Sequence, residues 1–424
     1  MLPGAMSNPA PSHSVAVIGG AVAGAEVAAT LADRGALVAV LEQNPRPFGK
    51  IEDGLPRWHA ALRRKEYETI GEKLSRPNVA FVPLTSIGKH VSFRELTHDW
   101  GFSAVVLACG AWRDRPLPVE GADRYVGRGL VYQNPFIIWF NHANEAAYRG
   151  PVFEPRDGAI VVGGGLASID VVKVLMLETT RAKLRERGIE VPMVELEVKG
   201  IPKILAGHGL AFEDLGLAGC TLYYRRRAED MPLVEVPDGA TPERAAKVLA
   251  SRAKLLEKAM EKYRFKVEPL CMPDALLVAG DRLAGLRFRR TRADAGKIVP
   301  CDETFEARGP YVVSSIGSIP EPIEGIETKG ELFRFTDWEL GRLDGYPNVF
   351  SAGNVVTGKG NIVASRKHAA SVASKVADEI AKLPPVGDAA LAAVHERVRK
   401  RQRAVGYPGD YASWMARVTP PDLE

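Results

Sequence analysis

Short apolar runs that break into glycines recur along the chain, and two of them share one pattern. Residues 15–18 and 160–162 are continuous apolar runs, typical of short buried strands. Each run ends in a glycine-rich turn and continues as a helical segment, predicted over 25–34 and 169–177. The turns begin at Gly19 and Gly163, 144 residues apart. This order of strand, turn and helix is typical of a site that places a diphosphate on a helix N-terminus.

The rest of the pattern predicts a mixed α/β chain. Further strands are expected at 37–41, 79–82, 104–107, 265–270, 275–278, 286–290 and 311–313, the 265–290 strands forming a small sheet. Further helices are expected at 62–74, 241–263, 364–381 and 389–403, with Thr241 as the N-cap of the second. Residues 179–217 are expected to be an insertion that contains a charged helical segment and a loop at 200–209.

Composition narrows the class of protein. The chain of 424 residues is 46% hydrophobic and 25% charged, which is ordinary for two or three globular domains. A net charge of +4 does not indicate a nucleic-acid partner. No apolar run approaches the roughly 20 residues that span a bilayer, so no membrane association is expected. The first residues lack the features of a secretory signal and are expected to be a flexible lead-in.

The cysteines exclude several kinds of redox and metal site. The four are Cys109, Cys220, Cys271 and Cys301, and no two form a CxxC or CxxxxC pair. A local redox dithiol is therefore excluded, as is a zinc or iron–sulfur site built from clustered cysteines. We expect inert thiols, no metal site and a reducing, cytoplasmic location.

The first glycine turn is followed by an acidic residue at the spacing typical of a dinucleotide-binding site. Gly19, Gly20 and Gly24 surround the turn, and Ala21 replaces the middle glycine of a G-x-G-x-x-G pattern. Glu42, 23 residues after Gly19, stands where a carboxylate accepts hydrogen bonds from an adenosine ribose. The alternative is a plain βαβ unit that binds no nucleotide.

The second turn is followed by arginines instead. Residues 163–168 form a G-x-G-x-x-S turn through Gly163, Gly165, Leu166 and Ser168. Asp170 is expected in the first turn of the next helix, where the helix dipole stabilises its carboxylate, so a purely structural role is the alternative. The run LYYRRRAEDMP at 222–232 stands where an NADH enzyme carries an acidic residue. Arginines there neutralise a 2′-phosphate, which favours NADPH over NADH. Arg225 and Arg226 match the pattern, and Arg227 is a third candidate.

Several further segments resemble a known family. Pro47-Phe48-Gly49, Gly54 and His59 match the PFG…G(V/L)xxxH loop of the adrenodoxin reductase and ferredoxin–NADP reductase group. The segments FIIWFN at 136–141 and SSIG at 314–317 resemble the same family, as does a Gly353–Asn354 turn where most relatives have Gly-Asp. The arginine run also resembles the NADPH segment of glutamate synthase small subunits. The resemblance covers most of residues 14–380.

This resemblance implies a fold and a set of binding residues. It implies two Rossmann-like dinucleotide-binding domains of the glutathione reductase type, with an NADPH domain (117–317) inserted in a discontinuous FAD domain (1–116 and 318–424). His59 is implied near the flavin, and Asp170 on the nicotinamide side. A lone histidine is otherwise an ordinary surface residue, and a proton-handling role for His59 or Glu235 stays open. The further cofactor-binding residues implied are Phe48, Gly49, Cys109, Gly110, Gly317, Gly353, Asn354, Gly360, Asn361 and Ile362.

The implied function is electron transfer. Hydride would pass from NADPH to FAD, and single electrons would then pass to an acidic ferredoxin-like iron–sulfur protein, because the chain has no dithiol to receive two. The alternatives are a flavin subunit of a glutamate synthase-like complex and a stand-alone reductase of a small molecule such as a quinone. An FAD monooxygenase fits poorly, and a redox sensor would show negligible bleaching by NADPH. Neither the acceptor nor the oligomeric state follows from the sequence.

Two basic segments have open roles. Arg57, Arg63, Arg64 and Lys65 form either a solvated face or a docking patch for the acidic carrier. The helix predicted at 389–403 is expected to present a solvated basic face, with an acidic partner or nucleic acid as the alternative. Its basic residues are Arg397, Arg399, Lys400, Arg401 and Arg403.

Overall fold

The chain divides into two compact units. A computed structural model describes residues 11–237, 239–294, 297–358 and 360–420. Most of the lead-in predicted at residues 1–14 lies outside them, but His13 and Ser14 are buried in the first strand, so a flexible lead-in is wrong for these two residues. Unit 1 comprises the chain up to Leu55, His59–Arg113, and the chain from Ser318 onward. Unit 2 comprises Pro56–Trp58 and Asp114–Gly317. Unit 1 is thus discontinuous, with the bulk of unit 2 inserted between its halves.

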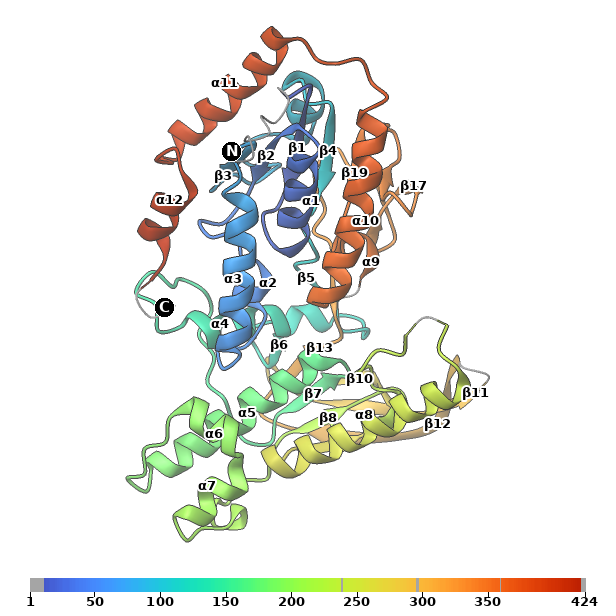
Figure 1. The fold of residues 1–424 in the computed structure, drawn as a ribbon. Helices are drawn as coiled ribbons and strands as arrows, with labels where there is room; N and C mark the ends of the chain where they lie inside the picture. Colours follow the sequence, from blue (N-terminus) through green and yellow to red (C-terminus); the bar gives the residue numbers. More distant parts are fainter. Residues whose placement is uncertain (1–10, 238, 295–296, 359, 421–424) are drawn as a thin grey trace. The chain divides into compact units, whose positions relative to one another are not determined.

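Unit 1 is built on a parallel five-stranded sheet (Figure 1). Its strands in spatial order are β19 (Val349–Ser351), β4 (Ala104–Leu107), β1 (His13–Ile18), β2 (Ala36–Leu41) and β3 (Val79–Val82). In the register, Val17 of the central strand lies between Val40 and Val106. The central strand is apolar at successive positions because both faces of the sheet are covered.

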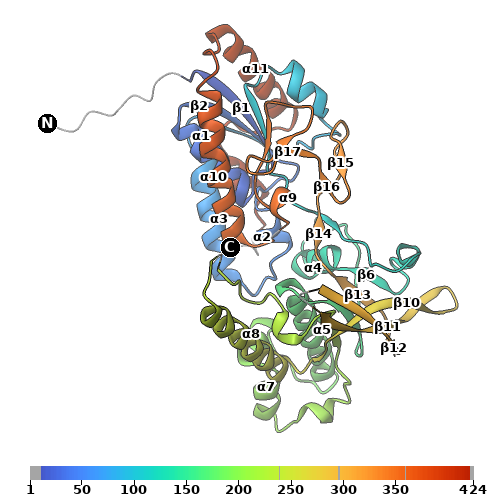
Figure 2. The same cartoon turned by 90° about the vertical axis from the view of Figure 1, so that its right-hand side faces the viewer.

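Helices cover one face of this sheet, and a second apolar layer covers the other. Helices α1 (Val22–Asp33), α3 (Ala60–Leu74) and α10 (Ile362–Ile380) lie side by side (Figure 2). Val15 and Val17 belong to the core that includes α1 and α10 residues, whereas Ala16 and Ile18 belong to a second core with Phe93. The smaller elements of unit 1 are α2 (Lys50–Asp53), the π-helix η1 (Glu95–Asp99), β14 (Ser318–Ile319), β15 (Thr328–Lys329), β16 (Leu332–Phe333), β17 (Phe335–Asp337), β18 (Arg342–Leu343) and α9 (Asn354–Thr357).

Two C-terminal helices, α11 (Asp388–Ala404) and α12 (Tyr411–Val418), run along unit 1 (Figure 1). The α11 side chains Val394 and Val398 are buried in the second core. Arg397 of the same helix donates a hydrogen bond to the Trp100 carbonyl, and Arg401 donates to the Leu84 carbonyl. The expected solvated basic face is therefore present at the exposed Arg397, Arg399, Lys400 and Arg403, whereas Arg401 is partly buried against the backbone.

Unit 2 is built on a second parallel five-stranded sheet. Its strands in spatial order are β6 (Leu130–Tyr132), β13 (Val312–Ser315), β7 (Ile160–Gly163), β8 (Thr221–Tyr223) and β9 (Lys266–Glu268). The strand predicted at 265–270 is therefore part of the main sheet rather than of a separate small one. The reason is that β9 pairs with β8 along the chain segment Thr221–Tyr223.

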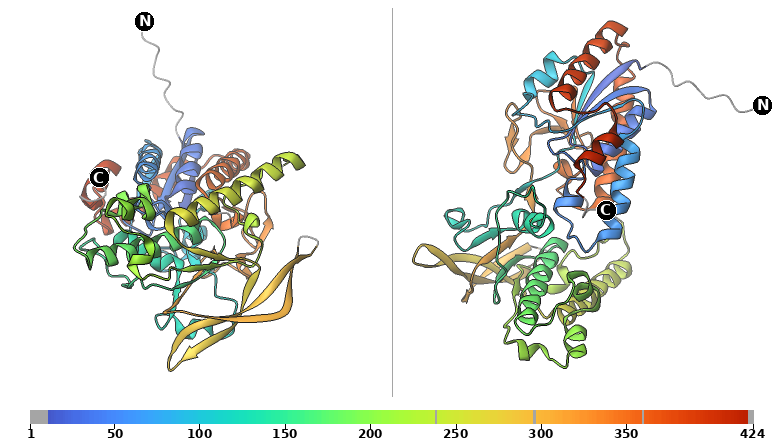
Figure 3. Two further views of the ribbon diagram at one scale, coloured as in Figure 1. Left: turned by 90° about the horizontal axis from the view of Figure 1, so that it is seen from below. Right: turned by 90° about the vertical axis from the view of Figure 1, so that its left-hand side faces the viewer.

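The two faces of the unit 2 sheet are covered by different structures. Val161 and Val313 pack in a core with the helices α4 (Gln133–His142), α5 (Leu166–Arg185), α6 (Met193–Lys199), α7 (Ile201–Gly207) and α8 (Pro242–Tyr263). Val162 and Val312 pack in another core with residues of an antiparallel three-stranded sheet. That sheet consists of β10 (Cys271–Ala279), β11 (Arg282–Asp294) and β12 (Lys297–Arg308), the last two forming a long hairpin (Figure 3).

Several helix bounds differ from those predicted. The loop expected at 200–209 is mostly the helix α7, because Ile201, Ile204 and Leu205 are buried at helical spacing even though Gly200 and Pro202 suggest a break. Thr241 caps α8 as predicted, accepting a hydrogen bond from the Arg244 N–H. The remaining short elements are β5 (Arg113–Asp114) and the 3₁₀ turns η2 (Ala122–Tyr125), η3 (Phe212–Leu215) and η4 (Ala228–Asp230). Within the described residues, no helix has both the length and the apolar character needed to cross a bilayer.

Candidate functional site

The first glycine turn, between β1 and α1, is packed too closely for side chains. A Cβ on Gly24 would lie 1.8 Å from the Gly19 carbonyl oxygen, and a Cβ on Gly19 would lie 2.7 Å from the Ala108 carbonyl oxygen. Gly19 also has φ +99°, in the left-handed region that favours glycine. The turn therefore depends on these two glycines to bring α1 against the ends of β1 and β4.

Ala21 fits this turn although it replaces a glycine. Its backbone is extended, with φ −72° and ψ −160°, so an L-residue fits there without strain. Ala21 is also the N-cap of α1, and its methyl group forms no capping hydrogen bond. The N–H groups of the first helical turn and the positive end of the helix dipole are therefore available to an anion.

Glu42 lies directly after β2, beside the same turn. Its carboxylate accepts hydrogen bonds from the Gly20 N–H and the Asn44 N–H, both at 2.8 Å. The residue is buried, and desolvation raises its pKa to about 7, although the two backbone N–H groups lower it. The structure thus holds a carboxylate with a perturbed pKa next to the helix N-terminus.

Two segments distant in sequence also meet the N-terminus of α1. A Cβ on Gly49, in the loop after Glu42, would lie 2.9 Å from the Ala21 Cβ. A Cβ on Gly353 would lie 2.6 Å from the Ala23 Cβ. Cys109 approaches Gly19 in the same way, with its Cα 3.1 Å from a Gly19 Cβ. The structure therefore brings four of the predicted segments, 19–24, 48–49, 109–110 and 353–354, to one place in unit 1.

Other predicted residues of these segments have structural partners. Phe48 is buried and stacks on Tyr67, with 3.9 Å between ring centroids. Burial raises the pKa of the Cys109 thiol to about 12, so this thiol is unreactive at neutral pH. Gly110, which follows it, has φ +69°.

The Gly353–Asn354 turn begins the short helix α9. The Gly353 N–H donates a hydrogen bond to His368 Nδ1 at 3.0 Å, so His368 must be neutral to accept it. Burial, followed by the charge of Lys375, lowers the pKa of His368 and favours that neutral form. The Asn354 Oδ1 atom is buried and has no hydrogen-bond partner among the described residues. A buried acceptor of this kind is costly unless a ligand satisfies it.

The residues 360–362 lie at the start of α10. Asn361 is the N-cap, and its Oδ1 accepts a hydrogen bond from the Ala364 N–H. The helix itself begins at Ile362, whose side chain packs on the unit 1 core, and Gly360 precedes it as an exposed residue. The structure thus gives the Asn361 side chain a capping role.

His59 and the basic residues near it lie at the start of α3. His59 is the N-cap residue and partly exposed. Arg63 is buried and donates hydrogen bonds to the Tyr67 hydroxyl and the Glu52 carbonyl. The expectation that Arg63 belongs to a solvated or docking face is therefore wrong, whereas Arg64 and Lys65 are exposed.

The second glycine turn, between β7 and α5, is also closely packed. A Cβ on Gly163 would lie 2.5 Å from the Ser315 carbonyl oxygen, and a Cβ on Gly164 would lie 2.1 Å from the Tyr224 ring. Ser168 is fully buried and its hydroxyl donates to the Gly165 carbonyl at 2.7 Å. Gly165 is the N-cap of α5, has no capping side chain, and faces open space. The N-terminus of α5 is therefore a second position open to an anion.

The start of α5 differs from the prediction. The helix begins at Leu166, which is exposed, so Asp170 lies in the second turn and not in the first. The argument from the helix dipole is therefore weaker for Asp170 than expected. Gly317 follows β13, two residues after its last residue Ser315, with φ +99°, and its carbonyl accepts the Arg115 N–H at 2.9 Å.

The arginine run after β8 has one paired and two unpaired members. Arg227 binds both carboxylate oxygens of Asp230, at 3.0 and 2.9 Å, which lowers the pKa of Asp230. Within the described residues, the guanidinium groups of Arg225 and Arg226 form no ion pair. Arg227 is therefore a weaker candidate for a ligand than its two neighbours.

These arginines line a pocket of about 250 Å³ together with the β11–β12 hairpin. The hairpin contributes Arg292 and Lys297, which the sequence did not single out. Nearby arginines on β11 have partners: Arg287 and Arg289 bind Asp274, and Arg290 binds Glu268. Among the described residues, the pocket thus gathers four cations, Arg225, Arg226, Arg292 and Lys297, that form no ion pair.

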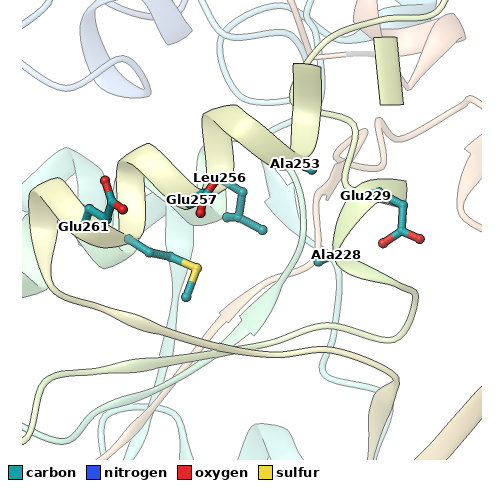
Figure 4. A pocket seen from close by; sticks show the side chains of 7 residues that line it. Ala228, Glu229, Ala253, Leu256, Glu257 and Glu261 are labelled. Carbon is teal, nitrogen blue, oxygen red and sulfur yellow. The ribbon is translucent and has the colours of Figure 1, made fainter. Parts of the chain in front are cut away.

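A second hollow, between η4 and α8, has the opposite character (Figure 4). It is lined by the apolar residues Ala228 and Leu256 and by three acidic residues, Glu229, Glu257 and Glu261. The three carboxylates would repel a phosphate, so we assign no nucleotide to this hollow.

Sequence reasoning missed residues whose position depends on tertiary packing. Tyr224 was part of the arginine run but had no role, and its ring lies on Gly164 of a turn 60 residues earlier. His368 belonged to a segment predicted only as a helix, and Arg292 and Lys297 lay between the strands predicted at 286–290 and 311–313, where no element was expected. The glycines flanking a strand end were the only local signal, and they did not show which side chains they face.

Comparison with known proteins identifies relatives of the chain. No protein-family profile matches it. NADPH-ferredoxin reductase FprA of Mycobacterium tuberculosis is 24% identical over 373 residues, covering 81% of this chain and 76% of FprA. Cindoxin reductase of Citrobacter braakii is 31% identical over 169 residues, which cover 38% of this chain and only about a third (34%) of that protein. The chain is similar in sequence to these reductases. The predicted resemblance to the adrenodoxin and ferredoxin reductases is thereby confirmed.

A solved structure of one of these relatives resembles the fold of the chain. The structure of Mycobacterium tuberculosis FprA in complex with NADPH matches with a TM-score of 0.68 and 21% identity, over 93% of this chain and 91% of that one. This confirms the predicted fold class, an α/β protein with two Rossmann-like domains. The homologue therefore shares both halves of unit 1 and the inserted unit 2 in its architecture.

Proposed function

We propose that the chain is an FAD-dependent NADPH oxidoreductase that passes electrons to a ferredoxin-like iron–sulfur protein. FAD would bind unit 1, predicted as residues 1–116 and 318–424, and NADPH would bind unit 2, predicted as residues 117–317. The observation that carries the proposal is the pair of open helix N-termini. One lies beside the buried Glu42, and the other belongs to the unit that carries Arg225 and Arg226, which form no ion pair within the described residues. The names of the relatives, among them an NADPH-ferredoxin reductase, support it.

The residues of unit 1 fit an FAD. The diphosphate would lie on the N–H groups of the first turn of α1, and Glu42 would accept hydrogen bonds from the adenosine ribose. The buried Asn354 Oδ1, which has no partner among the described residues, would accept a hydroxyl of the ribityl chain. When bound, the flavin supplies a ring that accepts hydride and gives up electrons one at a time.

The residues of unit 2 fit an NADPH. The N–H groups at Gly165 and Leu166 would hold its diphosphate, and Arg225 and Arg226 would hold its 2′-phosphate through bidentate hydrogen bonds. Tyr224 covers the glycine turn between these two groups, so its ring keeps water from that side of the diphosphate. We propose His59 beside the flavin and Asp170 beside the nicotinamide, where they would orient the rings.

The proposed acceptor is an acidic, one-electron carrier in the cytoplasm. The chain has four free cysteines and no CxxC pair, so it contains no dithiol that could take up two electrons. Free thiols are also typical of a reducing compartment. Two relatives are named as reductases of cindoxin and ferredoxin, which supports a protein acceptor for this chain.

Anaerobic titration of the purified protein with NADPH, and then with NADH, tests the proposal. NADPH should bleach the flavin absorbance at lower concentration than NADH. The Arg225→Glu variant should weaken NADPH at least tenfold and leave NADH nearly unchanged, because it replaces a cation that faces the 2′-phosphate by an anion. Arg282→Glu, an exposed arginine on β11 outside the pocket, is the matched control. Equal effects of Arg225→Glu on both nucleotides would refute the assignment.

The acceptor needs a separate assay. Reduction of a purified [2Fe–2S] ferredoxin by NADPH through this protein should exceed its reduction of a quinone. A higher rate with the quinone would favour the small-molecule reductase instead. Stable co-purification with a large amidotransferase subunit would favour the glutamate synthase-like complex.

A further inference from the structure

The β11–β12 hairpin is bound directly to the arginine run. The Thr291 hydroxyl of β11 is buried and donates a hydrogen bond to the Arg225 carbonyl at 2.8 Å. The Thr291 N–H donates to the Leu270 carbonyl at 2.8 Å, and the Leu270 N–H donates to the Arg226 carbonyl at 3.0 Å. The backbone of the arginine run and the hairpin are therefore held in one fixed arrangement.

Leu270 shows how firmly this arrangement is determined. It has φ +57°, a left-handed conformation that is uncommon for a residue with a branched side chain. Such a conformation is energetically unfavourable and persists where the surroundings fix it. Here both backbone polar groups of Leu270 are bound, one to Arg226 and the other to Thr291. The hairpin residue next to Thr291 is Arg292, so its position relative to Arg225 is fixed as well.

The charges around the pocket are unbalanced. Arg225 and Arg226 lie on one side, and Arg292 and Lys297 on the hairpin side. The Asp230 carboxylate also lines the pocket, but it is engaged by Arg227. Asp294, opposite Lys297 in the hairpin register, forms no ion pair with it in the described residues. Four like charges repel one another across a pocket of about 250 Å³, which favours binding of a multiply charged anion.

We propose that Arg292 and Lys297 complete the 2′-phosphate site of NADPH, so that the hairpin and the arginine run bind this phosphate from two sides. This inference rests on the proposed function and assigns the residues that set its preference for NADPH. Because Arg292 and Lys297 come 67 and 72 residues after Arg225, the Rossmann motif alone does not contain the whole specificity site. A nucleotide that lacks the 2′-phosphate would leave these four cations without an anion, whereas NADPH would bind both the arginine run and the hairpin through this phosphate.

Calorimetric binding of 2′,5′-ADP and 5′-AMP to the flavin-loaded protein tests the proposal without using activity. The variants are Arg292→Gln, Lys297→Gln and the double variant, with Arg282→Gln as a control at the far end of β11. Each single variant should weaken 2′,5′-ADP roughly tenfold, as expected for loss of a hydrogen bond to a charged phosphate. Binding of 5′-AMP, the flavin content and the melting temperature should stay unchanged, and Arg282→Gln should bind both nucleotides like the parent.

Three outcomes separate this inference from the proposed function. If Arg225→Gln weakens 2′,5′-ADP but the hairpin variants do not, the hairpin role is wrong and the proposed function stands. If the parent protein fails to distinguish 2′,5′-ADP from 5′-AMP, both are wrong. If inorganic phosphate alone binds the pocket as tightly as 2′,5′-ADP does, the pocket is a general anion site and the hairpin role is again wrong.

Discussion

Glu42 offers a quantitative test because its carboxylate is buried at 5% exposure beside the first glycine turn. Desolvation raises its pKa from an ordinary 4.5 to about 7, against the opposing effect of the Asn44 and Gly20 N–H groups. A displacement of this size corresponds to about 3 kcal/mol of preference for the protonated form in the folded protein. The perturbation is the substitution Glu42→Gln, which removes the titration and keeps the size of the side chain.

The sign follows from the direction of the pKa. Because the folded pKa is raised, the stabilising contribution of Glu42 is fully present below pH 4.5 and is lost as the pH rises through about 7. Protein stripped of flavin should therefore lose up to about 3 kcal/mol from this residue between pH 4.5 and pH 8. Urea unfolding of parent and Glu42→Gln proteins at several pH values measures this, because their difference cancels the other titrating groups. A difference that is constant with pH, or that grows in the opposite direction, would refute the reasoning.

Flavin binding should have the reverse dependence. The hydroxyls of a bound ribose donate to the Glu42 carboxylate and favour its ionised form, so binding should release a proton below pH 7. FAD affinity of the parent protein should therefore fall as the pH decreases from 8 to 5, and that of Glu42→Gln should not. Fluorescence quenching of added FAD at each pH provides the measurement.

Three further substitutions test the packing of the two sites. Gly164→Ala places a methyl group 2.1 Å from the Tyr224 ring. The resulting overpacking, about 1–3 kcal/mol, should weaken NADPH binding at least tenfold. If the additional substitution Tyr224→Ala does not restore NADPH binding, the ring is not the cause of the loss. Asn354→Leu removes a buried acceptor that lacks a partner among the described residues, so it should preserve or raise the stability of the flavin-free protein in urea while FAD is lost on gel filtration. Retention of FAD by that variant would contradict the assignment. Trp414→Ala should cost about 3–5 kcal/mol in urea unfolding, because Trp414 is buried and its Nε1 donates to the Pro45 carbonyl; a loss below 1 kcal/mol would show that α12 contributes little.

The sequence predicted most strands of the two parallel sheets, because strands buried on both faces are continuous apolar runs, but it missed the short strand β6. The starts of the helices after the glycine turns were less accurate. Helix α1 begins at Val22 and α5 at Leu166, several residues before the predicted starts, because residues of the turn already have helical backbone. The helix α7 was missed because a glycine and a proline at its start outweigh three buried apolar residues in a local pattern.

The candidate sites likewise combine residues that the sequence indicates locally with residues that only tertiary packing brings in. The glycine turns, Glu42 and the arginine run are local in sequence, so their spacing alone indicates them. The contact of Tyr224 with Gly164 and the approach of Arg292 to Arg225 depend on pairing between distant strands, which a single sequence does not show. The burial of Arg63 depends likewise on the short helix α2, because Glu52 of that helix supplies a carbonyl to which Arg63 donates.

The two halves of unit 1 impose an order on biosynthesis. Strand β19 completes the sheet from residue 349 onward, and α12 holds the loop after Glu42 through Trp414 and through the Val418 carbonyl, which accepts a hydrogen bond from Arg46. A ribosome that has translated the first 113 residues has therefore produced both the first glycine turn and Glu42, but not the segments that enclose them. The inserted unit 2 is continuous from Asp114 to Gly317 and can fold while translation proceeds. The proposed flavin site accordingly has all of its enclosing segments only after residue 418 has been translated.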